Sequence, residues 1–272
     1  MKKLTVLLLA ALLVVPSCKN QNKGSNNDQG KEPVTAEEIL SEELKVNVSN
    51  LAESAKKMKR IPFATKKADG SFALTEKEKM VKPDYLLDPA TANDLISFSQ
   101  KYRVIAMLGA DLMITNLYDM ANTEYKNAIN KILVDLNDDA LNQIASIDWS
   151  MENEYFQEDF DTFVEEEYKA GRENFFWEST ASFLVEQVYI LTRNIDKFMP
   201  MFTDETAADV TFDFVCVHEG LVQMIAKYPE MSSLNEVLEP LYVINAITVD
   251  QLKEQLMSIK SDIEAARAFL LK

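Results

Sequence analysis

Apolar residues recur every three or four positions through most of the chain after residue 35, and this spacing predicts α-helix almost throughout. Only 6 glycines occur in 272 residues, which argues against a sheet-rich fold with many tight turns. The pattern therefore predicts an all-α protein. We expect residues 35–272 to form a single domain, a multi-helix bundle of roughly eight to ten helices.

Cap residues and prolines give the expected limits of these helices. Patterns of the form T-x-x-E or S-x-x-E, and proline after Asp88, predict helix starts. Gly109 is expected to let a neighbouring backbone come close, and Pro240 to kink or split its helix. The expected helices are 35–60, a short one from 75, 91–116, 122–135, 138–147, 151–170, 174–199, 206–227, 233–247 and 248–270.

The last of these helices has a narrow apolar seam in which spacings of three and four alternate. Thr248 and Gln251 predict its capped start. One interpretation is a helix lying in a groove of its own bundle, and the other is a two-stranded coiled coil with another chain. The seam residues are Val249, Leu252, Leu256, Ile259, Ile263, Ala266 and Leu270.

The first residues differ from the rest of the chain. A positive start at Met1-Lys2-Lys3 precedes an apolar run, Leu4 to Val15, that is too short to cross a bilayer as a helix. Val15-Pro16-Ser17-Cys18 resembles the lipobox of bacterial lipoproteins. The resemblance implies that residues 1–17 are a signal peptide and that Cys18 receives fatty acyl chains such as palmitate. The alternative is an ordinary secretory leader with an unmodified cysteine.

Residues 18–34 are rich in Asn, Gln, Gly, Ser and Lys, a composition typical of a flexible tether. Two or more acyl chains on Cys18 would hold such a chain stably at a membrane. The residue after Cys18 is Lys19 and not aspartate, which by analogy with Gram-negative sorting favours the outer membrane. We therefore expect a cell-envelope protein that faces the periplasm.

Charge and cysteine content narrow the possible partners. The chain has 28 Lys and Arg against 44 Asp and Glu; without Lys2 and Lys3 the balance is 26 against 44, a net charge of −18. This charge disfavours nucleic acid as a partner, since its binding requires cationic groups that release counterions. A lipidated Cys18 leaves Cys216 without a disulfide partner, so the chain is not a disulfide scaffold.

Two stretches carry a family resemblance, KYRVIAMLGADLMITNLYD at 101–119 and FFWESTASFLVEQVYILTRN at 175–194. They resemble an uncharacterised family of all-helical lipoproteins from Bacteroidota, in which a GADL helix precedes an aromatic-acidic helix. Gly109-Ala110-Asp111-Leu112 matches the first motif, whereas Trp177 and Glu178 match the second loosely. The resemblance implies an all-helical envelope lipoprotein and transfers no catalytic residue.

Asp111 is a candidate site residue because it is a charge among apolar neighbours and needs a partner. Arg103 lies two turns earlier on nearly the same face, and Lys101 or Arg193 could also reach it after folding. The interpretations are a buried structural pair or a carboxylate that holds a ligand.

His218 is the only histidine, and Cys216-Val217-His218-Glu219 is the only cluster of soft and basic ligands. This spacing does not bring three ligands to one ion, so we expect no metal site and no cofactor. His218 would sit on a half-buried helix, with a general-base role beside Glu219 as the alternative. The aromatic residues around Trp177 are expected either in the core or lining a pocket between helices.

Residues 148–178 contain eleven acidic side chains. Phe156, Phe160, Phe163 and Val164 form an apolar stripe, which places the acids on the opposite face of a helix. That face is expected to be solvated, with attraction of a cationic partner or loose binding of divalent ions as functional alternatives.

These features favour a non-enzymatic function. The expectation is a binding or scaffold protein, anchored in the envelope through Cys18, that engages a partner through a helical groove, the acidic face or the C-terminal heptad helix. The alternative is a helical small-ligand-binding protein or enzyme. It would have an inter-helix pocket around Asp111, Trp177, Glu178 and His218.

Overall fold

The computed structural model describes residues 46, 74–138, 163–164 and 166–272, all of which belong to the unit Ala36–Lys272. The part of the chain that it describes contains helices and no strand, so the all-α prediction is confirmed. The elements are α3 (Glu76–Lys79), η1 (Pro89–Asn93), α4 (Phe98–Leu117), α5 (Thr123–Leu136), α8 (Glu173–Arg193), α9 (Ile195–Phe198), η2 (Met199–Met201), α10 (Asp204–Ile225), η3 (Pro229–Met231), α11 (Ser232–Tyr242), α12 (Val249–Ser258) and α13 (Lys260–Leu270).

Local capping determines where several helices begin. Thr75 forms the predicted capping box at α3. The helix expected from residue 91 instead starts at Phe98, where Ser97 Oγ accepts from Gln100 N and Gln100 Oε1 accepts from Ser97 N. Residues 89–93 form a separate 3-10 helix that begins after Asp88. The capping box at Ser97 therefore determines the start of α4, and the helix does not begin at residue 91.

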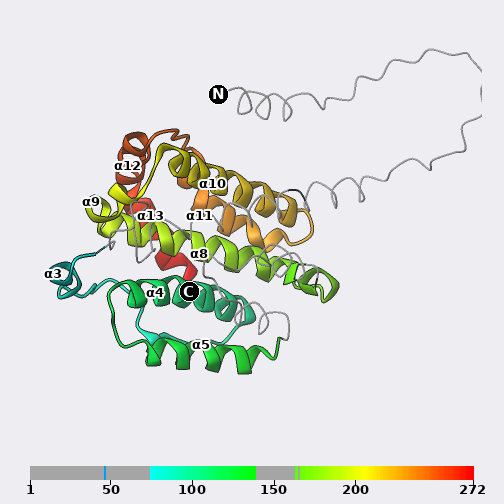
Figure 1. Cartoon of the computed structure of the whole chain (residues 1–272). Helices are drawn as coiled ribbons and strands as arrows, with labels where there is room; N and C mark the ends of the chain where they lie inside the picture. The colour runs from blue at the N-terminus through cyan, green and yellow to red at the C-terminus, as the bar shows by residue number, and fades with distance from the viewer. Residues whose placement is uncertain (1–45, 47–73, 139–162, 165) are drawn as a thin grey trace, which may run out of the picture. The chain divides into compact units, whose positions relative to one another are not determined.

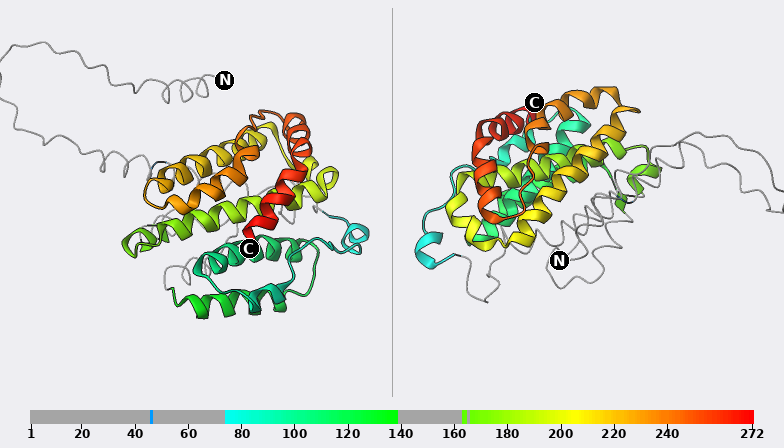
Figure 2. Two further views of the ribbon diagram at one scale, coloured as in Figure 1. Left: turned by 180° about the vertical axis from the view of Figure 1, so that it is seen from behind. Right: turned by 90° about the horizontal axis from the view of Figure 1, so that it is seen from above.

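Helix α8 is the central element of the described bundle (Figure 1). It packs along α4 on one side and against α10 on the other, and Figure 2 shows α13 crossing α8 and reaching α4. Its buried side chains lie all around its circumference, as expected for a helix enclosed by others. Eight of these side chains have no exposed surface: Trp177, Ala181, Ser182, Val185, Glu186, Val188, Ile190 and Leu191.

Gly220 of α10 lies against the indole of Trp177. A Cβ built on Gly220 would be 2.2 Å from Trp177 Cζ3, a distance that no real Cβ contact has. At Gly109, where we expected the close approach, a Cβ would meet nothing within 4 Å. No described residue therefore makes the close approach that we expected at Gly109.

The C-terminal seam lies inside the bundle, but it is not one helix. The helix is interrupted at Ile259 (φ −107°, ψ 17°), which lies between α12 and α13. Helix α13 packs on α8 and α11, and α12 on α10. The seam residues Leu252, Leu256, Ile263, Ala266 and Leu270 are buried within this chain. The structure thus has a seam in a groove of its own bundle, and the prediction of a continuous helix over 248–270 is wrong.

Pro240 lies inside α11 without splitting it. The helix continues to Tyr242 and ends there, earlier than the predicted residue 247. Pro240 lacks the N–H that would bind the carbonyl of residue 236, and α11 ends two residues after it.

Several predicted features lie outside the described residues. These are the leader and Cys18, the tether, the helices at 35–60 and 138–147 apart from Val46 and Asp138, and most of the acidic segment at 148–178. From its apolar stripe, Phe163 and Val164 are described and buried. Among the described helices, none combines the length and the apolar character that crossing a membrane requires.

Candidate functional site

Glu178 lies in a groove of about 280 Å³ between α4, α8 and the η3–α11 segment. Its Oε2 accepts from Arg103 Nε at 2.7 Å and from the hydroxyl of Ser99. The Glu178 side chain is 6% exposed and that of Arg103 is 16% exposed. The groove is therefore built around a partly buried ion pair that joins α4 to α8.

Polar atoms without an internal partner line the same groove. The Nη atoms of Arg103 and the side-chain amide of Asn174 make no hydrogen bond to any other described residue. The ring of Phe175 and the side chains of Met231 and Leu234 form an apolar wall of the groove. The arrangement can hold a small polar molecule, and Glu178 is the sequence-predicted candidate that lies in it.

Asp111 is fully buried, and its partners are not those expected. Its Oδ2 accepts from the backbone N–H of Leu87 at 2.7 Å, and its carboxyl group is within hydrogen-bonding reach of Glu186. Glu186 is also fully buried, and Arg267 of α13 binds it with Nε at 2.7 Å and Nη2 at 2.8 Å. The predicted pairing of Asp111 with Arg103 is wrong, because Arg103 turns toward α8 and binds Glu178.

Two buried carboxyl groups thus lie near one guanidinium, which binds Glu186 directly. The pKa of Asp111 is raised to about 8, chiefly by burial and then by the negative charge of Glu186, while the Leu87 N–H opposes both effects. Burial also raises the pKa of Glu186, against the opposing effect of Arg267. Asp111 Oδ1 accepts no hydrogen bond in the described part of the chain. The side-chain hydrogen bond between Asp111 and Glu186 favours a proton on Asp111 and so also raises its pKa.

A second buried carboxylate cluster was not predicted. Arg172 Nη2 donates to Asp138 Oδ1 at 2.9 Å and to Glu167 Oε1 at 3.0 Å. The hydroxyl of Tyr102 donates to Asp138. Burial raises the pKa of Glu167 to about 7, with Arg172 opposing this effect and the charge of Asp138 adding to it. The sequence offers only a weak sign of this cluster, since Glu167 lies in an acid-rich segment that indicates a solvated face.

The aromatic residues near Trp177 divide between core and pocket. Phe176 and Trp177 are buried, and Trp177 Nε1 donates to the Tyr168 hydroxyl at 3.1 Å. Phe175 lines the groove at Glu178, and Tyr189 lines a second pocket. Trp177 is a packing residue in this structure, because the backbone of Gly220 covers its ring.

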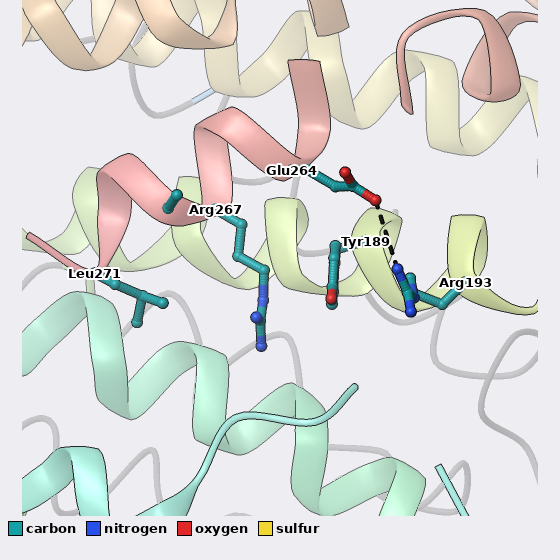
Figure 3. Close-up of a pocket in the computed structure, with 6 residues that line it drawn as sticks. Tyr189, Arg193, Glu264, Arg267 and Leu271 are labelled. Carbon is teal, nitrogen blue, oxygen red and sulfur yellow. Dashed lines mark ion pairs between the residues drawn. The ribbon is translucent and has the colours of Figure 1, made fainter. Parts of the chain in front are cut away.

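This second pocket, of about 320 Å³, lies between α8 and α13. Figure 3 shows Tyr189 between the side chains of Arg193 and Arg267, with Glu264 reaching across from α13 to Arg193. The distance from Arg193 Nη1 to Glu264 Oε1 is 3.6 Å. Arg267 therefore has two environments, a buried carboxylate pair on one side and this pocket on the other.

Cys216 and His218 do not form a reactive pair. Cys216 is 2% exposed, and burial raises the pKa of its thiol to about 12. His218 is half-buried with its ring stacked on Tyr242 at 4.3 Å between centroids. Glu219 is exposed beside it, and no hydrogen bond joins the two in the described structure. The described residues contain no group of three His, Cys, Asp or Glu side chains that could hold a metal ion.

The four candidates Asp111, Trp177, Glu178 and His218 have separate environments. Asp111 is in the carboxyl pair, Trp177 packs on Gly220, and His218 stacks on Tyr242. Of the four, only Glu178 lines either of the two pockets described above. The structure does not bring the four together around one cavity.

Comparison of the chain with protein-family models, with curated proteins and with solved structures finds no match in any of the three. The functional argument therefore depends on the chain's own residues.

Proposed function

We propose that this chain is a lipid-anchored protein of the cell envelope, of binding or scaffold type, whose helical domain engages its partner through an inter-helix groove. The observation that carries the proposal is the apolar run Leu4–Val15 followed at once by Pro16-Ser17-Cys18 and a polar tether. Acylation of Cys18 would hold the domain beside a membrane without a spanning helix.

The test is mass spectrometry of the mature N-terminus of the protein purified from its native host. We expect a chain that begins at Cys18 and carries fatty acyl groups. Cys18→Ala should leave the precursor uncut and unlabelled by a palmitate analogue, whereas the control Cys216→Ala should be processed and labelled as the parent is. A bare Cys18 thiol on the native protein would rule out the anchor.

The groove at Glu178 favours small-ligand binding as the second candidate function. The Nη atoms of Arg103 and the amide of Asn174 are available to a ligand there, next to an apolar wall. A thermal-shift screen of the full chain against envelope metabolites, with Asn174→Ala as the matched variant, separates the two candidates. A stabilisation that depends on Asn174 supports a small ligand, whereas crosslinked protein partners without any such shift support a scaffold.

A further inference from the structure

The pocket between α8 and α13 has an unusual set of side chains for so acidic a chain. Its lining consists of Tyr189, Arg193, Glu264, Arg267, Ala268 and Leu271, which is two arginines against one carboxylate. The chain as a whole carries a net charge of −16. Arg267 is also paired with Glu186 behind the pocket, so Arg193 is the guanidinium whose charge is least compensated there.

Three side chains in this pocket have hydrogen-bond donors that bind no other described residue. Arg193 has only a loose ion pair with Glu264, at 3.6 Å, and makes no hydrogen bond within the described residues. Arg267 uses Nε and Nη2 on Glu186 and on the carbonyl of Tyr85, and its Nη1 binds no described group. The hydroxyl of Tyr189 likewise has no hydrogen-bond partner in that part of the structure.

Arg267 is held in position before any ligand arrives, whereas Arg193 is held only loosely. The Cζ atom of Arg267 lies 4.2 Å from the centroid of the Tyr189 ring, and that of Arg193 lies 5.9 Å from the same centroid. The ring faces attract cations, and the Glu186 carboxylate fixes Arg267 from behind. Side chains ordered in advance lose less entropy on binding, so the pocket is suited to recognition.

From this geometry we infer that the pocket binds a small organic monocarboxylate. Guanidinium groups match a carboxylate because their parallel N–H donors bind its two oxygens. Ala268 and Leu271 offer methyl groups to a short apolar portion of the ligand. At about 30 Å³ per water-sized group, the pocket admits a molecule of on the order of ten non-hydrogen atoms.

The charge of the chain favours a monoanion over a phosphate. The long-range field of a strongly acidic protein opposes every additional negative charge on a ligand. A carboxylate carries one charge, whereas a phosphate group approaches two near neutral pH. The carboxylate of Glu264 competes with the ligand for Arg193. The carboxylate of the ligand replaces it as the partner of Arg193.

This inference goes beyond the proposed anchoring and does not require it, because all the pocket residues lie in α8, α13 and the residue after α13. The experiment titrates the full chain with butyrate, and separately with inorganic phosphate, at constant ionic strength, with calorimetry and thermal unfolding as readouts. We expect saturable binding of butyrate and weaker binding of phosphate. A bare Cys18 together with butyrate binding would refute only the anchor.

Matched variants identify the site. Arg193→Gln should weaken butyrate binding roughly tenfold or more, because it removes a charge-assisted contact. Lys126→Gln, an exposed change of the same charge on α5, should leave affinity unchanged. Glu264→Gln should tighten binding about two- to fivefold by removing the competitor. Its control is Asp135→Asn, whose residue has similar exposure (46% against 45%) and a similarly loose ion pair, and it should have no effect.

Three results would overturn the inference. The first is absence of saturable butyrate binding to the parent chain, and the second is phosphate binding more tightly than butyrate. The third is an equal loss of affinity in Arg193→Gln and Lys126→Gln, which would indicate a general charge effect. Folding of each variant is checked by its unfolding temperature without ligand, and Glu264→Gln keeps the test decisive even where Arg193→Gln unfolds early.

Discussion

Gly220 of α10 and Trp177 of α8 are in contact so close that no side chain fits between them: a Cβ on Gly220 would lie 2.2, 2.3 and 2.4 Å from Cζ3, Cη2 and Cε3 of the indole. Trp177 has no exposed surface, so its ring is enclosed by other residues. The distance between α8 and α10 is therefore set by a glycine.

Gly220→Ala should destabilise the protein because the new methyl group must displace either the indole or α10. Overpacking of this kind costs about 1–3 kcal/mol in the free energy of unfolding. Gly109→Ala is the matched control, since it is also a glycine-to-alanine change inside a helix but meets nothing within 4 Å. It should stabilise by roughly 0.5–1 kcal/mol through helix propensity. Denaturant unfolding of both variants checks the prediction, and a shift of the same sign in both would contradict it.

The Arg103–Glu178 ion pair should contribute through its partial burial. Arg103→Met leaves a carboxylate that is 6% exposed without its cation, and we expect a loss of about 2–4 kcal/mol in the free energy of unfolding. Removal of both charges in Arg103→Met/Glu178→Met should cost less than the sum of the two single changes. The double-mutant cycle measured by urea unfolding gives the coupling. Additive costs would show that the pair has no interaction of its own.

Asp111 should make stability fall as pH rises. Its pKa of about 8 in the folded protein is above the ordinary value of 3.8, so the folded state holds a proton that the unfolded state has released between these two pH values. The stabilisation is complete below about pH 4 and is lost as pH rises toward 8. Asp111→Asn keeps the acceptor for Leu87 N–H and a donor toward Glu186, and it cannot ionise.

Between pH 5 and 7 the unfolding free energy of the parent should therefore fall by about 1.4 kcal/mol per pH unit more than that of Asp111→Asn. Urea unfolding at several pH values measures the difference. Glu239→Gln, at an exposed position of α11, should leave the pH dependence of the parent unchanged. Parallel pH profiles for the parent and Asp111→Asn would show that Asp111 is ionised in the folded state.

Cys216 should be inert until the protein unfolds. Its thiol is buried and its pKa is raised to about 12 by burial, with the charges of Asp213 and Glu219 adding to the effect. Since the thiolate is the reactive form, alkylation at pH 8 should proceed no faster than unfolding. Labelling of the Cys18→Ala chain with iodoacetamide, with and without denaturant, tests this. Rapid labelling of the native chain would mean that Cys216 is accessible.

The sequence by itself determined the helical class and several helix starts. The apolar spacing, the caps at Thr75 and Thr248, and the turn at Asp88-Pro89 involve residues within about four positions of each other. Such local interactions act in the same way in any helical protein, and for that reason they can be read from the chain. The charge of Asp111 among apolar residues likewise indicated a buried group in need of a partner.

Tertiary packing alone decided which groups meet. Arg103 is two turns from Asp111 on the same helix, yet it binds Glu178, 75 positions away, because α4 turns that side chain toward α8. Glu186 and Arg267 are 81 positions apart and become partners where α13 lies on α8. Gly220, not Gly109, permits a close approach for the same reason. These contacts depend on how whole helices are placed against one another, which no local pattern specifies.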